Sequence, residues 1–248
     1  MTLDQPIMTG GIIAAGEGSR LRQAGYTVPK PLVPVAGTAL IERVIGNFLA
    51  AGIKSLVIIF NEEAGPECER WVRSRFPDVD IEIVIKTTVS SLESFFTVVE
   101  RIKAGLALIS TVDAWCSPND FKVFVQEAAR RPADATVLAV TPFVADERPL
   151  WALLDKSGRV KSLGGDTGTM VTAGMYLVPE RLRRLSVPKG LTRLRDFLGW
   201  LVESGEPVFG IPIETVVDVD RGEDVPLAET LASAFQSNKA DRSSEEVT

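Results

Sequence analysis

The sequence predicts an α/β fold in which antiparallel strands in the second half of the chain extend a mostly parallel central sheet. In the first half of the 248 residues, short apolar runs alternate with stretches whose apolar residues recur at helical spacing, a pattern typical of βαβ units. After about residue 135, strand-like runs follow one another closely and are separated by Pro, Asp and Gly. With 45% hydrophobic and 24% charged residues, the composition is that of a soluble globular protein.

The first half of the chain is predicted to alternate strands and helices. Buried strands are expected where short apolar runs occur, at residues 12–15, 56–60, 81–85 and 106–109. Helices are expected where apolar residues return every three or four positions, at residues 40–49, 67–76 and 92–102. Ser117 before Pro118 predicts the start of another helix, because Ser is a favoured N-cap and Pro suits the first helical position.

The second half is predicted to contribute short strands and two helices. The strands are expected at residues 136–140, 150–154, 159–163 and 216–219, and the helices at residues 194–202 and 227–235. Residues 237–248 are small and polar, which predicts a disordered tail. Since no Gly- or Pro-rich linker divides the rest, residues 1–236 are predicted to form a single domain.

The residue types present exclude several kinds of catalysis. The chain has no histidine, so it has neither a Ser-His-Asp or Cys-His relay nor a histidine ligand for zinc. Its two cysteines, Cys68 and Cys116, lie far apart and form no C-x-x-C motif, which argues against a metal knuckle or a redox pair. An enzyme of this composition must work with carboxylates, Lys, Arg, backbone amides or a hard metal ion.

Charge and hydropathy restrict the expected partners and location. The 33 acidic and 27 basic residues give a net charge of −6, which argues against a general binder of nucleic acid or anionic membranes. No apolar run is long enough to span a bilayer. The segment before Arg20 contains no Lys or Arg and so lacks the basic start of a signal peptide. We therefore expect a cytoplasmic protein without a nucleic-acid or membrane partner.

A glycine-rich turn after the first predicted strand is the most informative feature. The turn contains Gly16 and Gly18, is followed by Arg20, and precedes a Pro-Lys-Pro sequence centred on Lys30. Glycines let the backbone approach an anion, successive amides can surround phosphate oxygens, and the two cations add positive charge. The alternative interpretation is a tight turn with two surface cations.

Two familiar phosphate-binding motifs do not match this turn. A Walker loop requires G-x-x-x-x-G-K-[ST], which the segment lacks. A Rossmann fingerprint requires a third small residue where Leu21 stands, and an acidic residue about 20 positions further on at a strand end. Glu62 and Glu63 follow a strand but come too late in the chain. Binding of a dinucleotide, as in an oxidoreductase, is therefore the weaker alternative.

Residues 15–21 and 29–37 together resemble the sugar-phosphate nucleotidyltransferases, also called nucleoside-diphosphate-sugar pyrophosphorylases. They match the pattern G-x-G-x-R…P-K-x-L. The resemblance implies a Rossmann-like nucleotidyltransferase fold over nearly the whole chain and a reaction that joins a nucleoside triphosphate to a phosphate monoester, releasing pyrophosphate. It also implies that Arg20 holds the leaving pyrophosphate and Lys30 the reacting phosphates. The implied nucleotide-binding residues in this segment are Ala14, Ala15, Gly16, Glu17, Gly18 and Ser19.

Displacement at a triphosphate calls for Mg²⁺ held by one or two carboxylates. Asp113 comes just after the predicted strand at residues 106–109, at the sheet edge where α/β proteins bind ligands. Its alternative role is a helix cap, although Ser117 already suits that position. The resemblance places the first metal-binding aspartate here, usually after glycine, where this chain has Val112.

A second acidic segment lies near the end of the chain. Asp218 and Asp220 alternate with valines, so both carboxylates are expected on one strand face, an arrangement that suits a hard cation. The alternative is a capping box in which Asp220 and Glu223 begin the last helix. The resemblance implies that one carboxylate here joins the metal, and we favour Asp220 with Asp218 in support.

The remaining site predictions concern the base and the acceptor. Ser90 and Ser91 follow a strand at the same edge, and the resemblance implies contacts with the nucleotide there; the alternative for Ser91 is a helix cap. Residues 172–176 resemble the family's N-A-G-[IV]-Y segment, which implies that Thr172 and Gly174 approach the acceptor. The family's Glu-Lys-Pro motif is missing, with Lys161 nearby instead.

These observations predict a magnesium-dependent nucleotidyltransferase of nucleotide-sugar biosynthesis that joins a nucleoside triphosphate to a sugar 1-phosphate or a similar small phosphate monoester. One alternative is a cytidylyltransferase acting on a non-sugar phosphate, such as choline or inositol phosphate. Another is a nucleotide-binding regulatory module that has lost turnover. The sequence leaves the base, the acceptor and the oligomeric state open.

Overall fold

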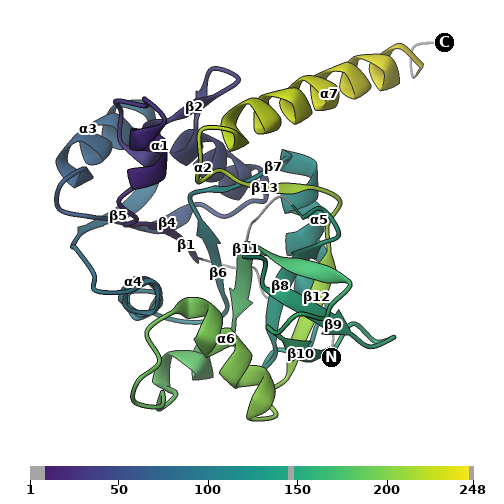
Figure 1. Cartoon of the computed structure of the whole chain (residues 1–248). Coiled ribbons are helices and arrows are strands. Elements are labelled where there is room, and N and C mark those ends of the chain that lie inside the picture. The colour runs from purple at the N-terminus through teal and green to yellow at the C-terminus, as the bar shows by residue number, and fades with distance from the viewer. Residues whose placement is uncertain (1–8, 145–147, 246–248) are drawn as a thin grey trace.

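The computed structural model describes residues 9–144 and 148–245, which form a nine-stranded sheet with helices on both faces (Figure 1). In the parallel half, β1 (Thr9–Ala14) lies between β4 (Ser55–Phe60) and β6 (Ala107–Thr111), and β5 (Asp80–Ile85) extends the sheet beyond β4. Successive residues of β4 pack into the cores on opposite faces of the sheet, which explains its uninterrupted apolar sequence.

The second half of the chain adds strands beyond β6, most of them antiparallel to their neighbours. Next to β6 lies β11 (Met170–Val178), followed at the edge by β9 (Trp151–Leu154) and β10 (Val160–Leu163). A branch of the same sheet pairs β8 (Thr136–Thr141) with β11, and β12 (Val208–Pro212) in parallel with β8. The predicted α/β fold with a mostly parallel sheet and antiparallel additions is confirmed.

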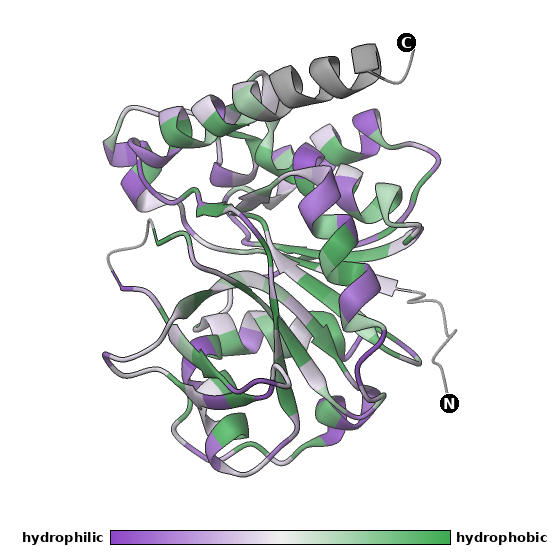
Figure 2. Cartoon of the chain, turned by 90° about the vertical axis from the view of Figure 1, so that its right-hand side faces the viewer, coloured by the Kyte–Doolittle hydropathy of each residue, from purple (hydrophilic) through white to green (hydrophobic). Residues whose placement is uncertain are grey.

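Helices cover both faces of the sheet and give the molecule two apolar cores. One core contains buried residues of α2 (Leu40–Ala50), α3 (Gly65–Arg75), α5 (Pro118–Ala128) and α7 (Asp224–Glu245). The other contains those of α4 (Ser91–Val99) and α6 (Leu194–Glu203). Figure 2 shows the apolar strands between these helices. Three short helical elements complete the helices: α1 (Ser19–Gln23) and two 3₁₀ turns at Lys30–Leu32 and Glu180–Arg184. Two small sheets lie outside the main sheet. One pairs β2 (Pro34–Val35) with β3 (Thr38–Ala39), and the other pairs β7 (Ala114–Cys116) with β13 (Val216–Asp218).

The strand order creates a crevice beside β1. After β1 the chain continues toward β4 on one side, whereas β6 lies on the other side, so the loops that follow β1 and β6 diverge. In open α/β sheets, ligands bind at such a switch point, outside the carboxyl ends of the strands. The glycine-rich turn follows β1 and Asp113 follows β6, so the sheet brings both to this crevice.

The end of the chain differs from the sequence prediction. Residues 237–245 were predicted as the start of a disordered tail, but they continue helix α7, and residues 246–248 lie outside the described residues. Polar composition suggests disorder, yet no Gly or Pro follows Pro226 to stop the helix. Within the described residues, no helix is long and apolar enough to cross a membrane.

Candidate active site

The glycine-rich turn after β1 combines one glycine required by packing with one that faces open space. Gly18 has a φ of +63°, and a Cβ there would lie 2.6 Å from Cβ of Lys30. Only glycine therefore allows the turn to pack against the Lys30 side chain. Gly16, by contrast, is exposed, and a Cβ at this position would meet no atom within 4 Å. The turn thus leaves room for a ligand at Gly16.

Lys30 connects the glycine-rich turn to the two acidic segments. Its side chain is 6% exposed, and Nζ lies 2.7 Å from Oδ2 of Asp113 and 2.7 Å from Oδ1 of Asp220. Nη1 of Arg20 lies 2.6 Å from the second oxygen of Asp220. The structure therefore brings together four predicted site residues from distant parts of the chain. We call these four residues, together with Gly16–Gly18, the phosphate end of the site.

Lys30 and Asp220 stay charged although both are partly removed from water, because opposite charges lie next to them. Burial favours the neutral form of Lys30, but Asp113, Asp220 and Asp218 outweigh it and raise the pKa of the ammonium group above its usual range. Burial likewise opposes the charge of Asp220, yet Lys30 and then Arg20 hold the pKa of this carboxyl below its ordinary value. Lys30 is therefore an ammonium and Asp220 a carboxylate at neutral pH.

A small two-stranded sheet brings Asp113 close to Asp220. β7 directly follows Asp113 and pairs antiparallel with β13, so that Asp218 lies opposite Ala114. The backbone carbonyl of Asp113 also accepts hydrogen bonds from the amides of Trp115, at 2.7 Å, and Val219, at 3.0 Å. The sequence prediction did not include β7, because three residues are too few to show a strand pattern.

Two expectations for the second acidic segment are wrong. β13 ends at Asp218, and the amide of Asp220 donates to the carbonyl of Asp218 at 3.0 Å, so the two carboxylates do not share a strand face. Asp220 bonds Lys30, whereas Asp218 lines a separate cavity. The capping box with Glu223 is also absent, since the amide of Asp220 donates instead to Oδ2 of Asp224, the first residue of α7, at 2.9 Å.

A cavity of about 240 Å³ adjoins the phosphate end through Asp113, and it is also lined by Asp218, whose charge acts on Lys30. We call this cavity the acceptor end, because Thr172 and Gly174, for which the resemblance implies an approach to the acceptor, both line it. Gly174 has a φ of +68°, and a Cβ there would lie 2.6 Å from Oγ1 of Thr111, so glycine is required at this irregular point of β11. Burial, followed by the charges of Asp113 and Asp218, raises the pKa of Tyr176 on the cavity wall.

Other predicted residues lie elsewhere or have another contact. Lys161 is exposed on β10 and does not line the cavity. Ser90, not Ser91, caps α4: its Oγ accepts from the amide of Glu93 at 3.1 Å. Ser91 lines the cavity and accepts a hydrogen bond from the amide of Leu194 at 3.0 Å.

The sequence analysis did not single out Asn61, which supports the glycine-rich turn. Its Nδ2 donates to the carbonyls of Ala15, at 3.4 Å, and Gly16, at 3.1 Å, while its Oδ1 accepts from the amide of Ala64 at 2.8 Å. The available signal was its position directly after the strand ending at Phe60, at the same sheet edge. Asn61 therefore fixes the backbone next to the open space at Gly16.

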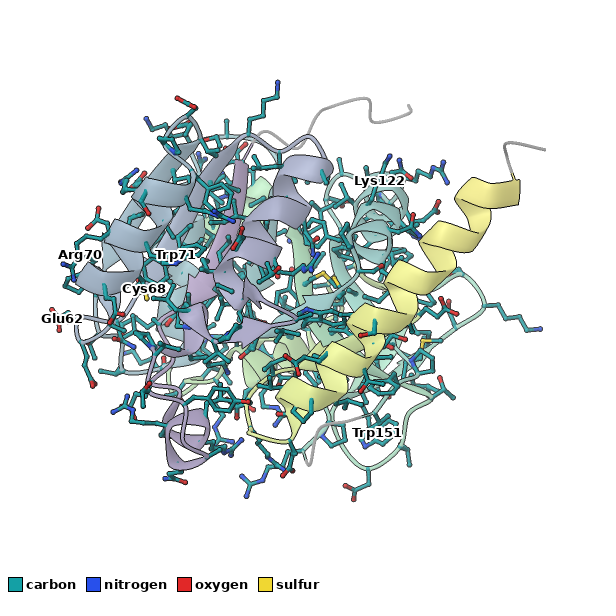
Figure 3. The ribbon with its side chains drawn as sticks, turned by 90° about the horizontal axis from the view of Figure 1, so that it is seen from above. Glu62, Cys68, Arg70, Trp71, Lys122 and Trp151 are labelled. Carbon is teal, nitrogen blue, oxygen red and sulfur yellow. The ribbon has the colours of Figure 1, made fainter. Side chains whose placement is uncertain are left out.

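Trp115 and Trp151 lie outside the lining of the acceptor cavity. Trp115 is 2% exposed in the core, and neither it nor Trp151 lines the cavity. Figure 3 shows Trp151 on the side of the molecule away from Cys68 and Arg70 of α3. The aromatic side chains that do line the cavity are Phe143 and Tyr176.

The residues at the switch point suit a divalent cation whose remaining ligands are oxygen atoms of the substrate. Asp113 and Asp220 each place an oxygen 2.7 Å from the same Lys30 nitrogen, so a cationic group already lies between the two carboxylates. Among the described residues, no group of three or more His, Cys, Asp or Glu side chains is placed to hold a metal ion. Mg²⁺ commonly binds one or two carboxylates together with phosphate oxygens and water, so this pair fits it.

An α/β sheet with an open glycine turn and a lysine–carboxylate cluster at its switch point is typical of proteins that bind nucleotides or other phosphates. Residues 10–199 match the family described as the MobA-like NTP transferase domain, and the chain belongs to this family. The resemblance to nucleotidyltransferases that the sequence motifs indicated is therefore confirmed.

Individual relatives agree with this assignment. The chain is 26% identical to 2-aminoethylphosphonate cytidylyltransferase of Lancefieldella rimae, over 69% of this chain and 68% of the relative. It is 28% identical to 2-C-methyl-D-erythritol 4-phosphate cytidylyltransferase of Nocardia farcinica, over 88% and 90% of the two chains. The fold resembles the inositol-1-phosphate CTP transferase from T. maritima, with a TM-score of 0.76 and 18% identity over 89% of this chain and 92% of the other.

Proposed function

We propose that this nucleotidyltransferase transfers a cytidylyl group from CTP to the phosphorus oxyanion of a small acceptor. The observation that carries the proposal is the position of Lys30, which bonds Asp113 and Asp220 between the open glycine turn and the acceptor cavity. The cytidylyltransferases among the relatives favour CTP as the first donor to test. A sugar 1-phosphate and a non-sugar phosphate or phosphonate are the two acceptor classes.

The reaction needs no general base. An oxyanion of the acceptor attacks the α-phosphorus of the triphosphate and forms one P–O bond, while the α–β bridging P–O bond breaks and its electron pair leaves with pyrophosphate. Phosphate monoesters and phosphonates are already ionised at neutral pH, which agrees with a chain that has no histidine. In this proposal, Lys30 neutralises charge on the reacting phosphates and Arg20 binds the leaving pyrophosphate, so that catalysis rests on alignment and electrostatics.

Asp113 and Asp220 are the proposed ligands of Mg²⁺, with Asp218 in support. When bound there, Mg²⁺ would supply charge neutralisation to the triphosphate. The same two carboxylates bond Lys30, so its ammonium group would add positive charge beside such a cation. We further propose that the enzyme acts on small phosphorylated metabolites in the cytoplasm.

Pyrophosphate release tests the proposed function. The protein is incubated with Mg²⁺, one of CTP, UTP, dTTP or GTP, and one of glucose 1-phosphate, inositol 1-phosphate, choline phosphate or 2-aminoethylphosphonate. Acceptor-dependent release that is fastest with CTP is the expected result. Binding of a triphosphate without release of pyrophosphate from any pair would instead favour the regulatory module.

A further inference from the structure

The acceptor cavity is small for a ligand site. Its volume of about 240 Å³ lies below the range of roughly 300–1,000 Å³ typical of pockets for drug-sized ligands. It is formed by the ends of β6, β8, β11 and β13 and by the start of α6, so its walls belong to the sheet and a packed helix. An occupant must therefore be compact.

Charges are distributed unevenly around this cavity. Asp113 and Asp218 lie where it meets the phosphate end, and among the described residues that line it Arg195 is the sole cation. Arg195 is the second residue of α6, and its Nη2 donates to the backbone carbonyl of Arg148 at 2.7 Å. Since a guanidinium carries five N–H donors, this bond fixes the group and leaves donors for an anion.

Lys161 is the basic residue expected at the acceptor, but Arg195 is the one that lines the cavity. The chain lacks the Glu-Lys-Pro motif of the family it resembles, and Lys161 is the basic residue nearby in sequence. The structure leaves Lys161 exposed on β10, away from the cavity lining. Arg195 comes from a different part of the chain but lines the cavity itself, so it can neutralise an anion there.

The walls of the cavity indicate the organic part of the acceptor. Phe143, Leu150 and Val171 are among the apolar side chains that line it. Of its hydroxyl groups, Oγ of Ser91 accepts from the amide of Leu194, and Oγ1 of Thr141 donates to the carbonyl of Glu214 at 3.1 Å. The lining also includes Thr111, Thr172 and Asp218, so the cavity offers both apolar and polar surface to the organic part of an acceptor.

We propose that Arg195 binds the phosphorus oxyanion of a compact acceptor in this cavity and thereby determines the affinity for the acceptor. The inference rests on the proposed function and assigns the acceptor-binding cation. Among the described residues, Arg195 forms no hydrogen bond or ion pair with Lys30 or Asp220, so its loss should affect the acceptor and leave the triphosphate site unchanged.

Steady-state kinetics with CTP, Mg²⁺ and two acceptors test the inference. Ethyl phosphate and glucose 1-phosphate share the phosphate group and differ in the organic part. Arg195→Gln should raise the KM for each acceptor that the wild type uses at least tenfold while the KM for CTP stays within twofold, and Arg195→Lys should restore part of the loss. The exposed neighbour Arg193 provides the control variant Arg193→Gln, which should behave as wild type.

A binding experiment separates this inference from the proposed function. Isothermal titration with ethyl phosphate alone requires no turnover. Binding to the wild type and to Arg193→Gln, weakened at least tenfold in Arg195→Gln, supports the role of Arg195 even if no pyrophosphate is released in any assay. Absence of binding to the wild type, or equal binding to Arg195→Gln, would overturn the inference.

Discussion

The phosphate end and the acceptor end hold their polar groups in different ways. At the phosphate end, charged side chains bond one another: Lys30 contacts two carboxylates, and Arg20 contacts one of the same pair. At the acceptor end, the guanidinium of Arg195 bonds a backbone carbonyl, and apolar side chains and hydroxyls surround it. The first region is fixed by its own charges, whereas the second is fixed by the scaffold and adjoins free volume.

In the proposed function, this difference assigns the phosphate chemistry to one end of the site and the choice of acceptor to the other. The charges at the phosphate end suit groups that every nucleoside triphosphate carries, namely phosphate oxygens and the cation bound to them. The acceptor cavity has walls that can vary in shape and polarity without moving Lys30. Relatives that are named for a phosphonate and for an erythritol phosphate fit such a division.

Loss of Lys30 should have the largest effect at the phosphate end. Lys30→Met removes the ammonium group but keeps an unbranched apolar stem, and we expect kcat to fall about 100- to 1,000-fold, the usual cost of removing one electrostatic stabiliser of a transition state. Pyrophosphate release measures the change, and circular dichroism checks the fold. The control is Lys122→Met on α5, labelled in Figure 3, because this lysine is exposed and does not line the acceptor cavity. Activity within tenfold of wild type would remove Lys30 from the mechanism.

Asp220 and Asp218 should respond differently, because Asp220 bonds Lys30 together with Asp113, whereas Asp218 lines the cavity. We expect Asp220→Asn to raise the Mg²⁺ concentration for half-maximal activity by at least about tenfold. Asp218→Asn should raise that concentration less, as expected of a supporting residue, and should raise the acceptor KM. Titration of Mg²⁺ against pyrophosphate release distinguishes the two variants. The reverse order would assign the second metal ligand to Asp218.

The two glycines of the turn provide a matched pair. Gly18→Ala forces a side chain into a positive φ and against Lys30, so we expect it to lower the free energy of unfolding by about 1–3 kcal/mol. Gly16→Ala meets open space and should change stability by no more than about 0.5 kcal/mol, while raising the KM for the triphosphate several-fold. Urea unfolding and steady-state kinetics measure the two effects. Normal triphosphate KM in Gly16→Ala would place the nucleotide elsewhere.

Loss of Asn61 should have the smallest effect on activity, because this residue only positions the backbone of the glycine-rich turn. Asn61→Ala removes the hydrogen bonds to the carbonyls of Ala15 and Gly16, and we expect a loss of about 1–2 kcal/mol in the free energy of unfolding. The KM for the triphosphate should rise by a few-fold with kcat nearly unchanged. The exposed neighbour Glu62 supplies the control Glu62→Ala. A fall in kcat without a change in KM would contradict a positioning role.

Sequence patterns predicted the parallel half of the fold and the edge where the site lies. Buried strands that end at Ala14 and Thr111 place Gly16 and Asp113 at one edge, because parallel strands share the direction of their carboxyl ends. The meeting of Arg20 and Asp220, 200 residues apart, could not follow from periodicity. It depends on the short β7–β13 pairing, which leaves no recognisable pattern, and was suggested by the family resemblance alone.

The acceptor residues were the least predictable. Lys161 is close in sequence to the Thr172–Gly174 segment, but its exposed position on β10 takes it away from the cavity. Arg195 belongs to no recognised motif, and its place in the cavity lining depends on how α6 packs against β10 and α4. The polar end of α7 shows a similar limit, since composition alone does not reveal where a helix stops.

Pyrophosphate release measured over a matrix of CTP and acceptor concentrations tests the division between the two ends most directly. Wild type, Lys30→Met and Arg195→Gln are compared under the same Mg²⁺ concentration. The account predicts that Lys30→Met lowers kcat about 100-fold or more at saturation, whereas Arg195→Gln raises the acceptor KM at least tenfold and leaves the CTP KM within twofold. Equal changes in both KM values for Arg195→Gln, or an undiminished kcat for Lys30→Met, would contradict it.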